Sequence, residues 1–376
     1  MRPITLPDIP YDATAVRPDW SDLPESVRQA INERLGSPVT AARSAGGGFT
    51  RAFAAVLETA APETPAPDAP APRTTHPRTA GPATAGRGAT GREAARPASD
   101  SGNRVFVKAA PLNDPVSQWY AREAAITEAL PPEVTAARPL WTMTESGWFV
   151  LCLDAIDGRV PALPWSQADL DATLRTWSSA ATALAHPSPR LLEIGLPTLS
   201  EIVRDEMSWW SLIAKRREPM PEPARGTIAP QRLAELAKLE RALPESVAGD
   251  TMSHGDLRVD NVLMDRNGRA WLCDWTWPCL GAPWFDTVTL LVSAYASGLD
   301  TDTVLRAWGA PDDGVDGALA ALSGYWLVRA GDGPSSASPH SRQHQRFSGE
   351  QALAWLAERR GWNTGGEAPR KRAWWR

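Results

Sequence analysis

Polar side chains stand among apolar neighbours at four positions in the last third of the chain: His254, Asp256, Asn261 and Asp274. The dipeptide Asn267-Gly268 lies between the last two and is the strongest two-residue hairpin signal, because both positions need a positive φ. If it forms the loop, Asn261 lies opposite Asp274, with Cβ atoms about 4.5–5.5 Å apart. Amide and carboxylate oxygens are ligands of Mg²⁺. The spacing predicts a magnesium site at the open end of this hairpin, although a longer loop would shift the pairing.

This segment resembles the catalytic segment of the aminoglycoside phosphotransferase family, kinase-like enzymes that phosphorylate hydroxyl groups of small molecules. The resemblance rests on His254-Gly255-Asp256, with an Asn five residues and a second Asp eighteen residues after Asp256. It implies that Asp256 is the catalytic base and that Asn261 and Asp274 bind Mg²⁺. Arg258 stands where a kinase carries a cation that contacts phosphate. His254 is predicted to pack beneath the loop as a structural residue.

A kinase-like fold requires a glycine-rich turn upstream, followed by a strand with an inward-facing lysine. Ser44–Arg51 supplies the turn, where a backbone without Cβ atoms can approach phosphates. Val105–Lys108 supplies the strand. Only four of the 39 basic residues are lysines, and the compact ammonium group of Lys108 suits the α- and β-phosphates of ATP. The nucleotide contacts expected in the turn are Gly47, Gly48, Phe49 and Thr50.

The next required element is a helix that presents a glutamate to this lysine. Helical periodicity places four residues of the predicted helix on one stripe: Trp119, Glu123, Ile126 and Leu130. A carboxylate on an apolar stripe is costly unless it is paired. We therefore predict an ion pair between Lys108 and Glu123; an accidental, partly buried glutamate is the alternative.

A continuous apolar strand, Trp148–Leu153, precedes the stretch in which the resemblance places the hinge between the lobes. Backbone groups near Asp154 and Ile156 would bind adenine. The required features follow one another in the expected order from about residue 40 to residue 300. The resemblance therefore implies ATP and Mg²⁺ as cofactors.

These features predict an α+β, bilobal protein-kinase-like fold. The expected parts are a small β-rich nucleotide-binding lobe over residues 1–153, a larger helical catalytic lobe over 154–362 and a basic tail over 363–376. Residues 58–104 contain no large apolar side chain and are predicted to be a disordered insertion between two strands. Helices of the second lobe are expected at roughly 167–185, 198–217, 229–243, 284–297, 313–330 and 345–360.

The residues after Asp274 indicate the class of acceptor. Gly281–Asp286 follows only seven residues later, which leaves no room for the long activation segment of a protein kinase. A small hydroxylated molecule is therefore the expected acceptor, such as an aminoglycoside, a related antibiotic or a metabolite. A catalytically idle nucleotide- or partner-binding module is the alternative. Asp286 is expected to cap the following helix, and the resemblance implies that it also braces the catalytic loop.

Acidic residues of the second lobe would suit a cationic aminoglycoside, or equally a solvated helix surface: Glu201, Asp205, Glu206, Asp312, Asp313 and Asp316. Some of the eighteen tryptophans could stack on a flat ligand, although most are expected in the core. The candidates for stacking include Trp277. The sequence leaves the identity of the acceptor open.

Composition excludes several classes of protein. The net charge of −5 gives no global electrostatic case for nucleic acid. The longest apolar stretch is half of what a membrane span requires, and no signal peptide is visible at the amino terminus. Three cysteines are too few for a disulfide framework. A cytoplasmic protein is expected, and its oligomeric state is open.

Overall fold

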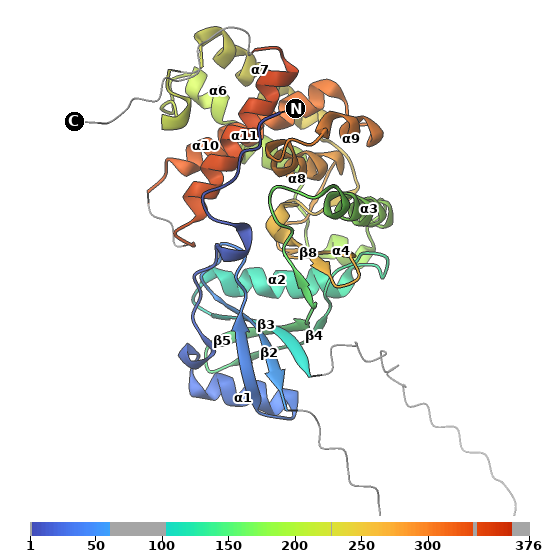
Figure 1. Cartoon of the computed structure of the whole chain (residues 1–376). Coiled ribbons are helices and arrows are strands. Elements are labelled where there is room, and N and C mark those ends of the chain that lie inside the picture. Colours follow the sequence, from blue (N-terminus) through green and yellow to red (C-terminus); the bar gives the residue numbers. More distant parts are fainter. Residues whose placement is uncertain (1, 61–102, 227, 334–336, 363–376) are drawn as a thin grey trace, which may run out of the picture.

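The structure is a computed structural model and describes residues 2–60, 103–226, 228–333 and 337–362. The predicted basic tail and residues 61–102 of the predicted insertion lie outside these ranges. The described residues form the expected mixed α/β fold, with a sheet-containing lobe below a helical lobe in Figure 1.

The smaller lobe is built on a five-stranded antiparallel sheet in the order β1-β2-β3-β5-β4. Its strands are β1 Val39–Ser44, β2 Phe53–Thr59, β3 Arg104–Pro111, β4 Pro139–Glu145 and β5 Trp148–Asp154. The strands on either side of the insertion pair with each other, with Ala54 opposite Lys108 and Leu57 opposite Val105. This pairing confirms the prediction that the insertion joins two neighbouring strands.

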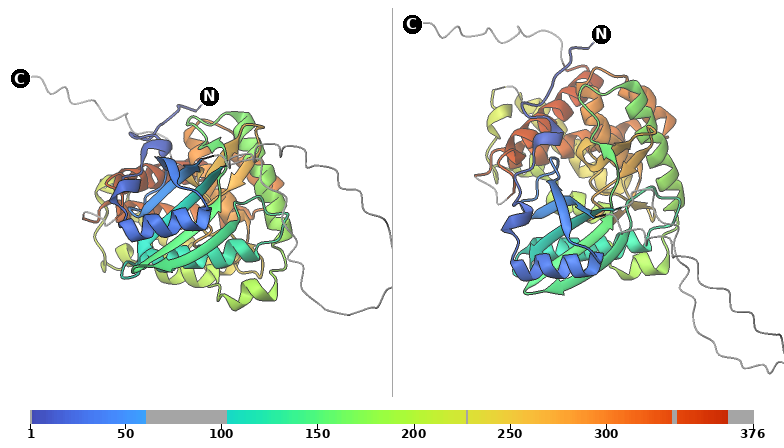
Figure 2. Two further views of the ribbon diagram at one scale, coloured as in Figure 1. Left: turned by 90° about the horizontal axis from the view of Figure 1, so that it is seen from below. Right: turned by 60° about the horizontal axis from the view of Figure 1, so that its bottom comes forward.

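Helices α1 Glu25–Leu35 and α2 Pro115–Ala129 cover opposite faces of this sheet. Val27 and Ile31 of α1 pack on one face, and Ala124 of α2 packs on Leu151 of the other. Alternate side chains of a strand point to opposite faces, so each strand contributes to both cores. Figure 2 shows α1 lying along the sheet.

Helix α2 begins four residues before the predicted stripe. Asp114 accepts a hydrogen bond from the Val116 backbone N–H at 2.9 Å and caps the helix, with Pro115 at the first position. The buried face consists of Tyr120, Glu123 and Thr127, among others. The prediction that Trp119 shares this face was wrong, because this residue is 37% exposed.

The lobes are joined directly after β5. The next strand, β6 Gly158–Arg159, already pairs with β8 Val262–Asp265 of the helical lobe. Residues 155–157 therefore make the connection at the predicted hinge.

The larger lobe is mainly helical. Its helices are α3 Gln167–Ala183, α4 Pro189–Glu193, α5 Leu199–Glu206, α6 Trp209–Ala214, α7 Pro230–Ser246, α8 Trp284–Ala296, α9 Thr301–Ala307, α10 Asp312–Ala330 and α11 Ser341–Arg359. The core lies around α8, every residue of which is buried. The predicted helix 198–217 is two helices, since the chain breaks at 207–208 and α6 begins anew where the buried Glu240 carboxylate accepts the N–H groups of Trp210 and Ser211.

The predicted hairpin forms with a loop one residue longer than expected. Strand β8 pairs with β9 Ala270–Leu272, and the loop is Arg266-Asn267-Gly268 with Gly268 at φ 73°. A three-residue loop of this kind is a type I turn followed by a left-handed residue. The register moves by one residue, so Asn261 lies beside Cys273, whose N–H donates to the Asn261 carbonyl at 2.9 Å. The predicted direct pairing of Asn261 with Asp274 was wrong.

The amino-terminal segment, residues 2–17, runs from the helical lobe to the sheet (Figure 1). The Thr5 N–H donates to the carbonyl of Ala296 in α8 at 2.8 Å. The Ala15 N–H donates to the carbonyl of Gly46, in the glycine-rich turn, at the same distance. One continuous segment is thus hydrogen-bonded to both lobes.

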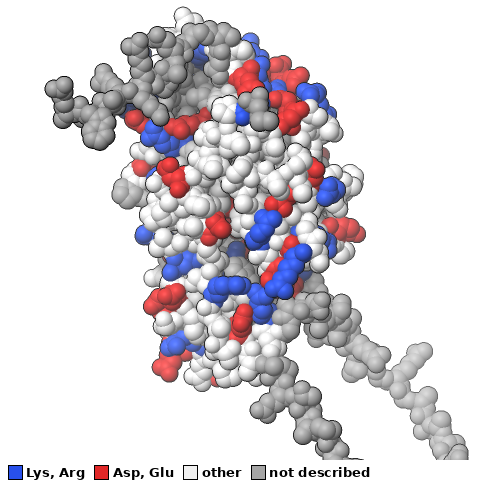
Figure 3. All heavy atoms as spheres, viewed as in Figure 1, with Lys and Arg blue, Asp and Glu red and all other residues white. Residues whose placement is uncertain are grey.

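Within the described ranges, no helix combines the length and the apolar character that a bilayer span requires. On the face shown in Figure 3, acidic and basic side chains are interspersed, and a broad uncharged area covers much of the helical lobe.

Candidate active site

The loop that contains Asp256 is hydrogen-bonded to the carboxylate of Asp286. The Asp286 carboxylate accepts the backbone N–H of His254 at 2.7 Å and that of Gly255 at 3.1 Å. Helix α8 begins at Trp284, so Asp286 lies inside its first turn and the predicted N-cap position was wrong. The expected brace of the loop is present.

His254 and Gly255 fix the path of this loop. His254 is fully buried, its Nε2 lies 2.9 Å from the Cys273 carbonyl oxygen and its ring lies 4.5 Å from that of Trp275. Burial lowers the pKa of His254 to about 4, which keeps the ring neutral and agrees with a structural role. Gly255 has φ 79°, and a Cβ atom there would collide with the Trp277 carbonyl oxygen. The loop therefore requires a glycine directly before Asp256.

Asp256 opens onto a cleft, with 26% of its side chain exposed. Its Oδ1 accepts a hydrogen bond from Arg258 at 2.6 Å and its Oδ2 accepts one from Asn261 Nδ2 at 3.2 Å. Burial raises the pKa of Asp256, although Arg258 and Asn261 lower it in part. The carboxylate thus has a fixed orientation and an elevated proton affinity, as a general base requires.

Arg258 is engaged by two carboxylates. Besides Asp256 it binds Asp260, with Nη2 and Oδ2 2.9 Å apart, and its guanidinium lies 5.7 Å from the centre of the Phe49 ring. Arg258 therefore connects the catalytic loop with the glycine-rich turn. A contact between Arg258 and phosphate stays a prediction.

Asn261 and Asp274 line the same cleft as Asp256. The Asn261 amide nitrogen donates to the Asp256 carbonyl at 2.7 Å, which leaves its oxygen for another partner. Asp274 has φ 60°, accepts the Thr276 hydroxyl at 2.7 Å and is 40% exposed. Burial alone would raise the pKa of Asp274, but Lys108 at 3.9 Å and the Thr276 hydroxyl bring it below its usual value. Asp274 is therefore an ionised oxygen donor.

These two residues fit a Mg²⁺ ion that takes its other ligands elsewhere. No group of three or more His, Cys, Asp or Glu side chains among the described residues could hold a metal. Mg²⁺ is commonly bound through one or two carboxylates, together with substrate phosphates and water. The donor set agrees with that arrangement and would not form an all-protein metal cage.

Lys108 and Glu123 form the predicted ion pair between β3 and α2. Lys108 Nζ lies 2.8 Å from Glu123 Oε1 and 2.7 Å from Oε2. Burial lowers the pKa of Lys108, but Glu123 and Asp274 more than compensate, so the ammonium group stays charged. Only 2% of Glu123 is exposed, so the pair replaces the solvation that its carboxylate loses.

The glycine-rich turn lies between β1 and β2 as expected and includes Gly47, Gly48, Phe49 and Thr50. Its carbonyl groups are bound by the amino-terminal segment: the Arg17 guanidinium donates to the Gly47 carbonyl at 3.0 Å and the Thr14 hydroxyl to that of Gly48 at 3.2 Å. A Cβ at position 46 would collide with the Asp12 carbonyl, and one at Gly47 would lie 3.1 Å from that of Tyr11. The amino-terminal segment therefore packs closely against the turn, and this packing requires glycines there. The sequence alone did not reveal this reason.

The hinge residues are only partly available for a ligand. The Asp154 N–H donates to the Arg138 carbonyl at 2.9 Å, and the Asp154 carboxylate accepts the Arg138 N–H at 3.2 Å. Adenine binding here would therefore use the Asp154 carbonyl and the Ile156 backbone. That contact stays a prediction.

The cleft has a volume of 1360 Å³ and lies between the lobes. The predicted residues that line it are Gly48, Phe49, Thr50, Asp256, Arg258, Asn261 and Asp274. Five predicted nucleotide contacts are outside its lining: Gly47, Lys108, Glu123, Asp154 and Ile156. Of the six acids considered for an aminoglycoside, only Glu206 lines the cleft.

The aromatic residues of the cleft that sequence reasoning missed include Tyr11, Trp119 and His344. Tyr11 and His344 come from opposite ends of the chain, with ring centres 4.3 Å apart. No local pattern marks either residue, because segments from opposite ends of the chain must come together before they meet. The periodicity of α2 had assigned Trp119 to the core.

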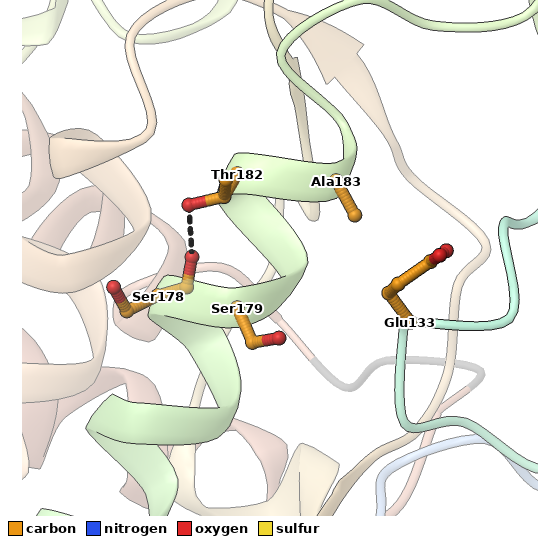
Figure 4. Close-up of a pocket in the computed structure, with 5 residues that line it drawn as sticks. All are labelled: Glu133, Ser178, Ser179, Thr182 and Ala183. Atoms are coloured by element: carbon orange, nitrogen blue, oxygen red, sulfur yellow. Dashed lines mark hydrogen bonds between the residues drawn. The ribbon is translucent and has the colours of Figure 1, made fainter.

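A second, smaller hollow of 540 Å³ lies on the surface beside α3 (Figure 4). Glu133 faces Ser178, Ser179 and Thr182 across it, and the Thr182 hydroxyl already donates to the Ser178 carbonyl at 2.9 Å. Glu133 is its one ionisable lining residue. Its described lining contains no predicted site residue and lacks the metal ligands and cations that phosphoryl transfer needs.

The model of the phosphotransferase enzyme family matches residues 84–322, more than half of the chain. The chain belongs to this family. The protein is therefore a kinase-like small-molecule phosphotransferase, as the catalytic segment predicted. None of the curated proteins compared with the chain matches it.

Solved structures of aminoglycoside phosphotransferase APH(4)-Ia share the fold of this phosphotransferase. A thermostable mutant in a ternary complex with AMP-PNP and hygromycin B has a TM-score of 0.54 and 12% identity, covering 90% of this chain and 99% of that one. Another thermostable mutant, with ADP and hygromycin B, has a TM-score of 0.52 and 10% identity at the same coverage. At such low identity the likeness is one of fold.

Proposed function

We propose that this protein transfers the γ-phosphoryl group of ATP to a hydroxyl group of a small molecule. The observation that carries the proposal is the convergence of Asp256, Asn261 and Asp274 on one cleft, beneath the glycine-rich turn. The base, the oxygen ligands and the phosphate-binding turn are the parts that phosphoryl transfer needs at one place.

Asp256 is the proposed base. Its carboxylate is oriented by Arg258 and Asn261 and opens onto the cleft, where it would accept the proton of the acceptor hydroxyl. The carboxylate that accepts the hydroxyl proton is already held in position. Its side chain therefore needs little rearrangement during the reaction.

Lys108, Asn261 and Asp274 are the proposed contacts of the nucleotide and its metal ion. Lys108 would bind the α- and β-phosphates while Glu123 fixes its position, and the oxygens of Asn261 and Asp274 would hold Mg²⁺. Mg²⁺ would neutralise charge on the phosphates. The Asp154 carbonyl and the Ile156 backbone would bind adenine.

The test compares Asp256→Ala with the wild-type protein in an ADP-release assay over a panel of hydroxylated compounds. We expect turnover to fall by at least about 10²-fold, since a general base contributes ~10²–10⁴-fold. AMP-PNP binding should persist, because the base contacts the acceptor. Asp205→Ala, which removes an exposed carboxylate outside the cleft, is the matched control.

Two outcomes would contradict the proposal. If Asp256→Ala keeps more than about a tenth of the wild-type rate, Asp256 is not the base. If wild-type protein binds AMP-PNP but releases no ADP with any compound, the alternative of an idle nucleotide-binding module holds.

A further inference from the structure

We propose that the acceptor is an uncharged or singly charged alcohol with a flat apolar face, which packs on Trp119 and Trp277, and that it is not a polycationic aminoglycoside. This inference rests on the proposed phosphotransferase function, because it concerns the acceptor side of the same cleft. It follows from the aromatic side chains, the apolar wall and the charges of that cleft.

Trp119 and Trp277 form an aromatic pair across the two lobes. Their ring centres lie 5.4 Å apart with an interplanar angle of 62°, and both rings line the cleft. Trp119 belongs to α2 of the smaller lobe, whereas Trp277 follows Asp274 in the larger one. The two residues are 37% and 49% exposed, so each keeps apolar area available for a ligand.

The backbone of Trp277 lies close to the loop of the proposed base. The Trp277 carbonyl packs so tightly against Gly255 that a Cβ atom would not fit there, and Gly255 directly precedes Asp256. The chain at Trp277 therefore packs against the loop that carries Asp256, and both side chains line the same cleft.

The cleft also has an apolar wall. It is formed by α5, α8, α10 and the residue after α5: Leu199, Met207, Phe285, Leu322 and Trp326. Such a wall stabilises a ligand through the apolar area that it removes from water. Its aromatic faces attract a cation weakly, but it offers no carboxylate in exchange for the hydration that an ammonium group loses on entering.

The charged residues that line the cleft also disfavour an acceptor with several positive charges. Apart from the three carboxylates of the catalytic centre, the described acidic residues that line it are Asp114 and Glu206. Asp114 is already the N-cap of α2. Arg51 and Arg122 line the cleft as well and oppose the binding of a cation. One carboxylate, Glu206, remains for a positive group of the acceptor.

The other acids considered for an aminoglycoside lie outside the cleft and are used or exposed elsewhere. Glu201 forms a capping box with Thr198. Asp316 binds Arg359 at 2.6 Å and Arg360 at 3.3 Å. Because carboxylates are absent from the described lining except at these few positions, a molecule with several ammonium groups would leave most of them unpaired.

The experiment measures dissociation constants by calorimetry in the presence of AMP-PNP for three probes. Phenyl β-glucoside and methyl β-glucoside have the same sugar hydroxyl groups and differ in the aromatic ring. Hygromycin B is the polycationic probe. We expect phenyl β-glucoside to bind about tenfold more tightly than methyl β-glucoside, and hygromycin B to bind no better than methyl β-glucoside.

Variants assign the preference to the aromatic pair. Trp277→Ala should reduce the phenyl-to-methyl ratio to about one, and Trp277→Phe should restore most of it. Leu192→Ala is the matched control, since it removes an apolar side chain that is 46% exposed and lies outside the cleft. Its ratio should equal that of the wild type. Melting temperatures verify that each variant is folded.

Equal affinity for the two glucosides, including the absence of measurable binding for both, would overturn the inference. So would a tenfold preference for hygromycin B, or a ratio that Trp277→Ala leaves intact. AMP-PNP binding is measured in the same samples. If AMP-PNP binds and the preference is absent, the inference alone fails; if AMP-PNP does not bind, the proposed function fails.

Discussion

Arg258 donates a hydrogen bond of 2.6 Å to Asp256, so the proposed base is paired with the cation that stands two residues after it. The same guanidinium binds Asp260, whose side chain has no exposed surface. Arg258 therefore orients the base as well as connecting the loop to Phe49 of the glycine-rich turn.

The pH dependence of turnover should reveal the pKa of Asp256 and the effect of Arg258 on it. Burial raises the pKa of Asp256 to about 7, and the base must be deprotonated to act. We therefore expect kcat/KM to rise with pH and to level off above about 7. The Arg258 guanidinium binds Asp256 and Asp260 through separate nitrogens. Lysine has a single nitrogen, so Arg258→Lys should weaken the contact with Asp256 and move the midpoint to higher pH. A pH–rate series over pH 5–9 with both proteins measures this, and an unshifted midpoint would mean that Arg258 does not control the base.

Asp274→Asn should weaken Mg²⁺-dependent nucleotide binding and turnover together. The substitution replaces a charged oxygen ligand by a neutral amide of the same shape. The measurement is the Mg²⁺ dependence of both ATP affinity and rate. Thr276→Ala, which removes the hydroxyl bound to Asp274 but keeps the carboxylate, should have a smaller effect. A Mg²⁺ titration that is unchanged in Asp274→Asn would rule out this ligand.

Gly46→Ala should destabilise the protein and raise the KM for ATP. The added methyl group would collide with the Asp12 carbonyl and displace the amino-terminal segment from the glycine-rich turn. Overpacking of this kind costs typically ~1–3 kcal/mol. Gly333→Ala is the control, because nothing lies within 4 Å of a Cβ atom there. Urea unfolding measures the stability of both variants, and ATP kinetics measure their KM. Equal stability and equal KM for the two variants would show that the amino-terminal segment does not support the turn.

Glu240 should make the protein less stable as the pH rises. Burial raises the pKa of Glu240 to about 7, although the Ser211 and Trp210 N–H groups lower it in part. The folded state then binds a proton more tightly than the unfolded state, whose pKa is about 4.3. The stabilisation is complete below about 4.3 and is lost as the pH rises through about 7.

Glu240→Gln, which cannot ionise, should lose less stability than the wild type between pH 5 and pH 8. Melting temperatures at both values measure the difference. Glu128→Gln, at an exposed position, should follow the wild type. Parallel curves for Glu240→Gln and the wild type would show that the carboxylate does not titrate in this range.

The sequence by itself identified the segment proposed as catalytic and predicted the order of the lobes and the Lys108–Glu123 ion pair. These features depend on local spacing: an Asp–Asn–Asp pattern around a hairpin, and the position of one carboxylate on the buried side of a helix. The same periodicity located most helices within a few residues. Local patterns are sufficient here because each concerns residues of one element or of neighbouring elements.

Tertiary structure decided the features that depend on how distant segments meet. One extra loop residue, with Gly268 left-handed, moved the register of the hairpin and separated Asn261 from the predicted partner. Trp119 faces the cleft because the second lobe places Trp277 against it. The need for glycine at position 46 arises from a segment more than thirty residues earlier in the chain. Periodicity identifies a buried side of a helix, but only the docked lobes determine which side faces a cleft and which charges line it.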